Sequence, residues 1–540
     1  MAEARSSRHD WIVLAVVCGF LFFYGLGAFG LVGADEPRYA QVAREMLERH
    51  DWVTPTLNHQ PWLEKPVLLY WEEIVAFHIF GVSDWAARVP SAFSATLMIA
   101  AIYLFLRRFR PRSQMDGALM TASCAAVLGF ARAAATDMPL AANFSIALLA
   151  WYAWYESRDR RWLLIAYGFL GLATLAKGPV AAVFFALTVG AFVLVRWDGR
   201  LIRNSLWLPG VAVYLAVTLP WFVAVQLRNP AFFRVFVLEH NLARFGTNLY
   251  RHRQPFWYFV PVVLIGLLPW TVFALAAVTE TVRGWWAEGR RVFEGEDAFD
   301  VFLLLWLAIP VVFFSFSQSK LPGYILPALP AAPLLIASYV RRRFDSDQIA
   351  SKVTVVFHAL LTGIVVMPCL LISYLVLVHR LPWGRGTLVA GILSLLVAVG
   401  VYVSLRRRSG WRLLHFSTLV PVVVAVAAII RLGGGAIDLE DSTRPVAVVL
   451  AENEAAAGTG SLPIAVFDVP RQTEYGLNFY RNQVVSSYDR GEIPAAAHLL
   501  VAREGAQADM AKLIGSRVVT AIGSNPDQHL EFYRVAASIR

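Results

Sequence analysis

Two carboxylic acids, Asp35 and Glu36, come shortly after the first long apolar run of the chain, Trp11–Val32. That run is long enough to cross a hydrocarbon core of roughly 30 Å at about 1.5 Å per residue. We therefore expect the acidic pair at a water–lipid interface, where a carboxylate can activate a nucleophile or accept a hydrogen bond from a hydroxyl group. Pro37 suits the first turn of a helix, and the residues after it repeat as in an amphipathic helix on the membrane surface.

Further charged residues lie beside the ends of other apolar runs. They occur in the segments Trp62–Pro66, Ala135–Pro139, Leu175–Pro179 and Ser317–Tyr324, and in the loop 227–255. One such charge is ordinarily an anchor at the membrane edge. Several lysines, arginines and carboxylates on the same side instead suit a substrate with an anionic head and a hydrocarbon tail, because cations neutralise a phosphate group.

The composition excludes a soluble globular protein. Hydrophobic residues make up 58% of the chain, charged residues only 16%, and the mean hydropathy is +0.55. The three cysteines, Cys18, Cys124 and Cys369, lie inside apolar runs, so we interpret them as small hydrophobic residues and not as metal ligands or disulfide partners. The net charge of +10 reports topology and contact with anionic lipid, not binding to nucleic acid, because the basic residues cluster between apolar runs.

The apolar runs predict a polytopic α-helical membrane protein with about 13 transmembrane helices. They cover 11–32, 88–107, 115–133, 138–155, 161–175, 178–196, 206–226, 256–278, 300–318, 322–341, 353–378, 386–406 and 411–431. The stretch 66–80 is shorter and carries Glu72, Glu73 and His78, so we interpret it as a surface or re-entrant helix. The N-terminal run exceeds the usual apolar length of a signal peptide, about 7–15 residues, and is interpreted as a retained helix.

Arginine clusters give the expected orientation. They lie at 5–8, 107–112, 158–161, 196–203, 290–291, 341–343 and 406–408, which fall on one side of the predicted membrane. The positive-inside rule makes that side cytoplasmic. Asp35, the loops 33–87 and 227–255, Lys177 and Lys320 are then external.

The composition changes after Leu432, where Gly433, Gly434 and Gly435 are expected to form a hinge. We predict a transmembrane domain over 1–435 and an external α/β domain over 436–540. Its expected strands are 463–468, 484–488, 498–502, 517–522 and 530–535, and its expected helices are 443–456, 474–481 and 508–514. This domain carries no nucleotide-binding motif, so we expect a lid or docking role and not catalysis.

A set of short motifs occurs in a fixed order along these spans. They are DEPRYA (35–40), LEKP (63–66), TDMP (136–139), LAKGP (175–179), an EH…HRQPFWY loop (239–258) and SKLPGY (319–324). In this order the chain resembles the glycosyltransferases of the GT-C fold that use polyprenyl-phosphate sugars. Within them it is most similar to the bacterial lipid A 4-amino-4-deoxy-L-arabinose transferases. The resemblance implies a GT-C fold over residues 10–435.

The resemblance also implies roles for individual residues. Asp35 matches the catalytic carboxylate of the family, and Lys65 matches the lysine that holds the phosphate of the lipid carrier. Further carrier-phosphate positions are Tyr324, Lys320, Arg251 and Arg253, with the choice between the two arginines left open. The expected lining of the substrate cavity consists of Glu36, Arg38, Tyr39, Glu64, Asp137, Lys177, His240 and His252.

The implied reaction moves aminoarabinose from undecaprenyl phosphate to lipid A phosphate groups with inversion, by a monomeric enzyme. It takes place at the periplasmic face of the bacterial inner membrane, so the resemblance implies that the external loops and the C-terminal domain are periplasmic. Asp35 would act as a general base toward a hydroxyl acceptor, or would orient donor or acceptor if the attacking group is an ionised phosphate. No cofactor or metal pattern is present, although Glu64 and Glu36 leave room for a divalent cation.

Three other functions are alternatives to this transferase activity. A related enzyme of the same fold would use a protein or another glycan as acceptor. A lipid or sugar transporter would carry inverted repeats and ionisable residues at mid-span, whereas the charges here lie at span ends. A purely structural scaffold would leave the external motifs without a role.

Overall fold

The computed structural model describes residues 2–243, 254–289, 297–345, 351–377, 383–406, 410–457 and 461–538. The backbone contacts divide the chain into two compact units, and each is described separately. The first unit comprises Met1–Tyr24, Leu63–Leu69 and Val89–Ile430, and the second comprises Gly25–Trp62, Tyr70–Arg88 and Arg431–Arg540. The second unit thus groups the C-terminal residues with most of the predicted external loop 33–87, including Asp35.

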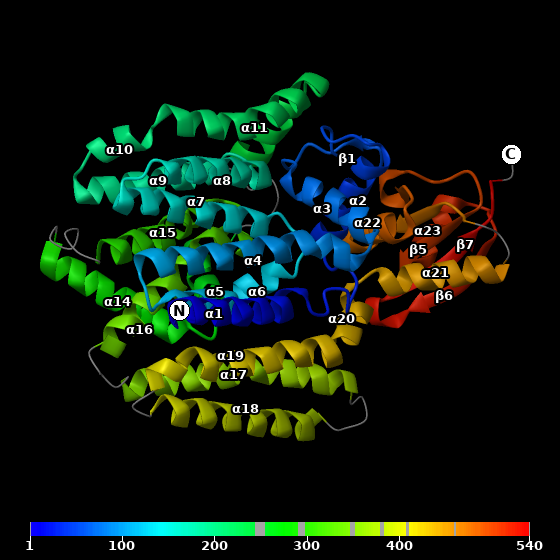
Figure 1. The fold of residues 1–540 in the computed structure, drawn as a ribbon. Coiled ribbons are helices and arrows are strands. Elements are labelled where there is room, and N and C mark those ends of the chain that lie inside the picture. The colour runs from blue at the N-terminus through cyan, green and yellow to red at the C-terminus, as the bar shows by residue number, and fades with distance from the viewer. Residues whose placement is uncertain are drawn as a thin grey trace. The chain divides into compact units, whose positions relative to one another are not determined.

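The first unit is helical in the part of the chain that the structure describes (Figure 1). Its helices are α1 (Ala2–Cys18), η1 (Gly19–Phe23), α5 (Gln114–Ala122), α6 (Ala125–Ala131), α7 (Asp137–Ser157), α8 (Arg161–Lys177), α9 (Val180–Arg196), α10 (Arg200–Ser205), α11 (Leu208–Arg228), η2 (Phe233–Ala243), η3 (Phe256–Tyr258), α13 (Phe259–Gly266), α14 (Thr271–Glu288), α15 (Asp297–Ser315), η5 (Pro322–Ala328), α16 (Ala331–Asp345), α17 (Lys352–Leu377), α18 (Trp383–Leu405) and α19 (Gly410–Ala428), together with most of α4 (Asp84–Phe109). Helices α17, α18 and α19 run side by side, and α7 packs against α8.

Five helices within the described residues are long and apolar enough to cross a membrane singly. They are Asp84–Phe109, Leu208–Arg228, Asp297–Ser315, Leu388–Leu405 and Leu413–Arg431. Two further spans are helix pairs bent by 116° between Gly266 and Thr271 and by 42° between Ala328 and Ala331, so at most seven spans meet this test. Of the remaining expected spans, 115–133 breaks between α5 and α6, whereas 138–155 lies in the continuous 21-residue helix α7, which is not among the helices that meet this test.

The first apolar run does not remain helical to its end, contrary to the single span expected over Trp11–Val32. Helix α1 passes into one turn of π-helix, η1, and the chain then leaves the helix at Tyr24. Gly25 adopts a positive φ of 66°, a conformation that glycine tolerates and that a helix cannot use. Gly27 and Gly30 follow, so the residues that lead to Asp35 form an irregular segment.

The second unit begins with this segment and continues into α2 (Asp35–Glu48), which starts two residues before Pro37 as expected. A short hairpin of β1 (Thr56–Leu57) and β2 (Gln60–Pro61) and helix α3 (Leu68–Phe80) follow. Helix α3 has 13 residues and is about 20 Å long, which is shorter than a hydrocarbon core. This length fits the expected surface or re-entrant helix.

The C-terminal domain contains a five-stranded sheet in the order β4-β3-β5-β7-β6. Its strands are β3 (Ile464–Phe467), β4 (Val485–Ser487), β5 (His498–Arg503), β6 (Val519–Asn525) and β7 (Leu530–Val535). Strand β3 is parallel to β4 and β5, while β7 is antiparallel to β5 and β6. Alternate strand residues pack against α21 (Arg444–Ala457) and α22 (Arg471–Arg481) on one face and against α23 (Gln507–Ile514) on the other. The predicted α/β domain is confirmed.

The glycine triplet before this domain is not the irregular hinge that its composition suggests. A π-helical turn, η6 (Ile429–Gly433), leads into helix α20 (Gly434–Asp441) without a break. Backbone hydrogen bonds of the helix therefore override the low helix propensity of glycine at this position.

Candidate active site

Asp35 is the first residue of α2 and one of two acidic residues in its first turn. Its side chain is 60% exposed, and its Oδ1 atom lies 2.5 Å from Nη2 of Arg38, one helical turn further along. The positive end of the helix dipole favours a carboxylate at this position. Asp35 is thus an accessible carboxylate that pairs with Arg38.

The guanidinium of Arg38 is held among three aromatic rings. Its central carbon lies 5.1 Å from the ring centroid of Tyr39, 5.3 Å from that of Trp62 and 5.6 Å from that of Tyr475 in α22. Cation–π contacts of this kind restrict an arginine without using its hydrogen-bond donors. They fix Arg38 beside Asp35.

Glu36 points away from solvent and forms a buried ion pair with Arg88. The two distances are 3.0 Å from Nε to Oε1 and 2.7 Å from Nη2 to Oε2. Oε2 also accepts a hydrogen bond of 2.8 Å from the backbone N–H of Val32. Glu36 was expected to line the substrate cavity, but the structure places it where it holds the segment that precedes Asp35. Tyr39 is likewise buried, with its ring beside that of Tyr70.

Helix α3 carries a second buried carboxyl group, Glu73, in the same unit. Its side chain is fully buried, and neither of its oxygens has a hydrogen-bond partner within the described residues. Burial raises the pKa of Glu73 well above its usual range, with smaller contributions from the nearby charges of Glu72 and Glu36. This shift favours the protonated, uncharged form of Glu73.

The first unit contains a pocket of about 250 Å³ with a cationic and an apolar part. Three polar residues from the predicted motifs, Lys65, Lys177 and Tyr324, line it together with His240 of η2. The apolar wall is formed by Val180, Val183 and Phe184 of α9 and by Phe313 and Phe314 of α15. This combination fits a ligand with a phosphate group and a hydrocarbon chain.

Asp137 and Lys177 meet through the ends of two neighbouring helices. Asp137 begins α7, Lys177 ends α8, and their Oδ1 and Nζ atoms are 2.6 Å apart. The ammonium group also lies 5.2 Å from the ring centroid of Tyr324. Gly323 permits this approach, because a Cβ atom there would lie 2.3 Å from Oδ1 of Asp137. The three motifs that carry these residues therefore converge in space.

The remaining predicted residues have different surroundings. Oε1 of Glu64 lies 3.8 Å from Nε2 of His240, which makes them neighbours near the pocket. Lys320 was expected to bind phosphate, but it is only 6% exposed and donates hydrogen bonds to the carbonyl oxygens of Ser317 and Gln254. It shapes the SKLPGY turn and does not line the pocket. Arg251, His252 and Arg253 lie outside the described residues.

Comparisons with known proteins identify the family and the fold. The family described as dolichyl-phosphate-mannose-protein mannosyltransferase matches residues 64–223. The undecaprenyl phosphate-alpha-4-amino-4-deoxy-L-arabinose arabinosyl transferase of Edwardsiella ictaluri is 30% identical over 424 residues, which cover 74% of this chain and 73% of the relative. The chain belongs to this arabinosyl transferase family.

Two other comparisons define the extent of the likeness. The arabinosyl transferase of Serratia proteamaculans is 31% identical over 377 residues, but the match covers 65% of its length, slightly less than two thirds. The crystal structure of ArnT from Cupriavidus metallidurans bound to undecaprenyl phosphate superposes with a TM-score of 0.76 and 24% identity, covering 98% of this chain and 99% of that chain. This match confirms the predicted GT-C fold. Family and spanning helices together identify a multi-pass inner-membrane protein.

Arg88 was not predicted from the sequence, although its hydrogen bonds hold the segment before Asp35. Its side chain is 1% exposed, and besides Glu36 it donates hydrogen bonds to the carbonyl oxygens of Leu26, Phe29 and Gly30. The available signal was a charged residue at the edge of the apolar run 88–107, since a buried arginine requires partners. The sequence could not reveal which partners these are.

Proposed function

We propose that this protein transfers 4-amino-4-deoxy-L-arabinose from undecaprenyl phosphate to phosphate groups of lipid A at the periplasmic face of the inner membrane. The observation that carries the proposal is the pocket of the first unit, where Lys65 and Lys177 lie beside an apolar wall. A long-chain lipid phosphate needs both features. Membership of the arabinosyl transferase family supports the same choice of donor.

The reaction forms a bond between an acceptor oxygen and the anomeric carbon of the sugar. The bond from that carbon to the phosphate oxygen breaks, and undecaprenyl phosphate leaves with the electron pair. The leaving phosphate needs no proton if cations stabilise its growing negative charge. We assign this role to Lys65, with Arg251 or Arg253 as the second cation, and we assign Lys177 and Tyr324 to the walls that orient the donor.

Asp35 is the carboxylate that we assign to the acceptor. If the acceptor is a hydroxyl group, Asp35 removes its proton as the sugar–oxygen bond forms. A phosphate acceptor is largely ionised, because the second pKa of a phosphomonoester is about 6, and Asp35 then orients the reactants. In both cases a single displacement inverts the anomeric carbon.

We expect the enzyme to need no cofactor. No cluster of three or more histidine, cysteine, aspartate or glutamate side chains with metal-binding geometry occurs within the described residues. Glu64 and His240 are two neighbouring groups, so a divalent cation beside Glu64 is the arrangement to test.

Purified protein in liposomes is the decisive test of the proposed function. Supplied with the undecaprenyl-phosphate-linked sugar and lipid A, it should produce lipid A heavier by one aminoarabinose residue per modified phosphate, in the presence of EDTA as in its absence. Mass spectrometry of the lipid measures this. A sugar found on protein or on another glycan, with lipid A unchanged, would favour the alternative acceptors, and carrier movement without transfer would indicate a transporter.

The C-terminal domain should be periplasmic, because the arginine clusters predict cytoplasmic loops on the other side. Ser516 is exposed and follows α23 in this domain, so Ser516→Cys places a reactive thiol at its surface. In a variant without the native cysteines, this thiol should react with a membrane-impermeant maleimide in intact spheroplasts. Labelling only after lysis would reverse the assigned orientation.

A further inference from the structure

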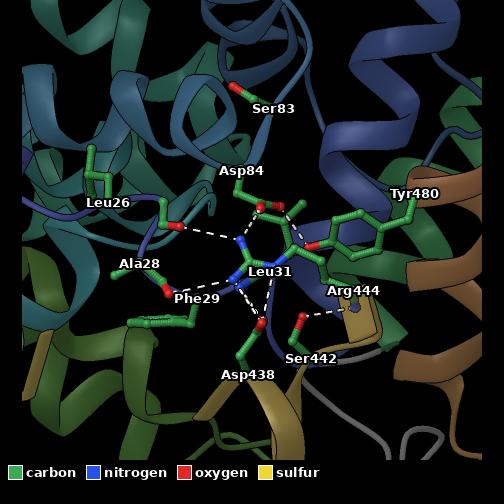
Figure 2. A network of polar contacts seen from close by, with 12 residues as sticks. Leu26, Ala28, Phe29, Leu31, Ser83, Asp84, Asp438, Ser442, Arg444 and Tyr480 are labelled. Atoms are coloured by element: carbon green, nitrogen blue, oxygen red, sulfur yellow. Dashed lines mark hydrogen bonds and ion pairs between the residues drawn. The ribbon is translucent and has the colours of Figure 1, made fainter. Parts of the chain in front are cut away.

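The irregular segment Gly27–Val32, which leads into Asp35, is fixed by side chains of the C-terminal domain. Figure 2 shows Arg444 of α21 at the centre of this network. Its guanidinium contacts two carboxylates, with distances of 3.0 Å from Nη1 to Asp84 and 2.8 Å from Nη2 to Asp438. Nη1 also donates to the carbonyl oxygen of Gly27 at 3.3 Å. One side chain of the C-terminal domain thereby contacts the segment that follows α1 and η1.

The same network binds the backbone N–H groups of the segment. The N–H of Gly30 donates to Oδ1 of Asp438 at 2.7 Å, and the N–H of Leu31 donates to the hydroxyl oxygen of Tyr480 at 2.6 Å. The Tyr480 hydroxyl donates in turn to Oδ1 of Asp84 at 2.6 Å (Figure 2). Burial and the charge of Asp84 raise the pKa of Tyr480, so its hydroxyl keeps the proton that this bond requires.

Close packing adds to these hydrogen bonds. A Cβ atom on Gly30 would lie 2.1 Å from Oγ of Ser442 and 2.5 Å from the hydroxyl oxygen of Tyr480. Val32 forms an isolated antiparallel bridge with Ser442. The segment therefore lies against the C-terminal domain along its length, and Gly30 lacks the side chain that would prevent this contact.

Helix α2, on the other side of Asp35, is attached to the same domain. Arg44 donates to the carbonyl oxygen of Phe479 in α22 at 3.1 Å, and Tyr475 of α22 contacts Arg38, the ion-pair partner of Asp35. Asp35 is the first residue of α2, so it follows a segment held by α21 and α22 and begins a helix held by α22. A glycine-containing segment has many accessible conformations, so the side chains that select one of them determine where the carboxylate is placed.

From this arrangement we propose that Arg444 and Tyr480 are positioning residues for Asp35, and that the C-terminal domain is a working part of the catalytic machinery. The proposal rests on the catalytic role assigned to Asp35 above. Neither residue is assigned a contact with substrate. They act by holding the backbone before Asp35, so their loss should reduce turnover without weakening the binding of the lipid carrier to the pocket of the first unit.

The test compares Arg444→Ala, Arg444→Lys and Tyr480→Phe with Arg490→Ala. Arg490 is a matched control because its ion pairs are with Glu474 and Glu492 of the same domain and not with residues 27–35. We expect Arg444→Ala and Tyr480→Phe to lower kcat about tenfold to hundredfold, with the Kd for undecaprenyl phosphate changed less than twofold. Arg444→Lys should recover part of the loss, because an ammonium group can pair with Asp84 or Asp438 but cannot reproduce the full fork of contacts.

Amide hydrogen exchange provides a measurement that does not depend on the reaction. Exchange at residues 27–35 should rise at least tenfold in Arg444→Ala and Tyr480→Phe and stay at the parental rate in Arg490→Ala. If exchange rises while kcat is unchanged, the network is structural and the proposal is wrong. If the parent shows no transfer at all, the proposed function fails, whereas the exchange result still reports on the segment.

A double variant separates action through Asp35 from general damage. Asp35→Glu keeps the charge but moves it, so partial activity should remain. If Arg444 acts by placing Asp35, Arg444→Ala should lower kcat by a smaller factor in the Asp35→Glu variant than in the parent. Fully additive losses in kcat, or equal losses in Arg490→Ala, would overturn the proposal. Tyr480→Phe removes one oxygen atom and serves as the deciding variant if Arg444→Ala does not fold.

Discussion

Asp35→Asn should lower the rate of aminoarabinose transfer by about a hundredfold or more. Asparagine keeps the size of the side chain but can neither accept a proton nor carry a negative charge. For a phosphate acceptor the loss of an orienting group costs about a hundredfold in rate. For a hydroxyl acceptor the loss of a general base costs about 10²–10⁴. The variant should insert and fold normally, because the Asp35 side chain is 60% exposed and its ion pair with Arg38 adds little to stability. Single-turnover transfer by the purified variant measures the loss.

The control for this experiment is Asp509→Asn. Asp509 is also an exposed aspartate one helical turn from its cationic partner, Lys512, but it lies in α23 of the C-terminal domain. This variant should transfer at the parental rate. Near-parental turnover in Asp35→Asn would remove Asp35 from the mechanism and leave it as a residue that caps the dipole of α2.

The contrast between Asp35 and Glu36 shows what a sequence can and cannot predict about a site. Both acids could be located after the first apolar run, but their neighbours could not be deduced. Glu36 is paired with Arg88, 52 positions further along the chain, and is buried, whereas Asp35 remains accessible. Local sequence places both at the start of one helix, and only the tertiary fold separates a structural acid from one available to substrate.

Lys320 and Lys177 show that the neighbours of a cation, like those of an acid, could not be deduced from the sequence. Both belong to motifs of the family, and both were expected on the external face. Lys177 lines the pocket, while Lys320 is used by the backbone carbonyls of its own turn and of Gln254. A buried ammonium group needs several acceptors, and the positions of those acceptors depend on how distant segments meet.

The secondary structure of the C-terminal domain was predictable where burial dominates. Strand β3, Ile464–Phe467, falls within the expected range 463–468, because a short apolar run bounded by turn residues is typical of a buried strand. Strand β6 extends to Asn525, beyond the expected end at 522. Most residues of β6 are at least partly exposed, so no alternation of apolar and polar residues marks its end. Its extent is set by pairing with β7.

The prediction of a single helix over Trp11–Val32 was wrong because an apolar pattern was present but did not specify a helix. Apolar composition predicted a helix to Val32, but it cannot distinguish a helix from an apolar segment that packs inside the protein. Gly25, Gly27 and Gly30 were visible, and they explain why the helix ends near Phe23. Hydrogen bonds from Arg88 and Arg444 satisfy carbonyl groups of the segment that these glycines form. Asp438 and Tyr480 accept hydrogen bonds from its N–H groups.

Lys65→Ala should weaken the binding of undecaprenyl phosphate by about tenfold to a hundredfold. A charge-assisted hydrogen bond to phosphate contributes about 1.5–3 kcal/mol, and each 1.4 kcal/mol is about a factor of ten in affinity. Lys65 lines the pocket that we assign to the carrier. Turnover should fall as well, because the contact strengthens as the departing phosphate gains charge, and interactions gained in the transition state act on the rate.

Two further variants test whether carrier binding depends on the charge of Lys65 or whether Lys65 only anchors the protein at the membrane surface. Lys65→Arg keeps the charge and should retain most of the affinity, while Lys512→Ala removes an exposed lysine from α23 and should change neither affinity nor rate. Titration of each purified variant with undecaprenyl phosphate gives the Kd. If Lys65→Ala binds the carrier as tightly as the parent, Lys65 is an interfacial anchor. The phosphate must then be held by other cations, of which Lys177 is already on the wall of the same pocket.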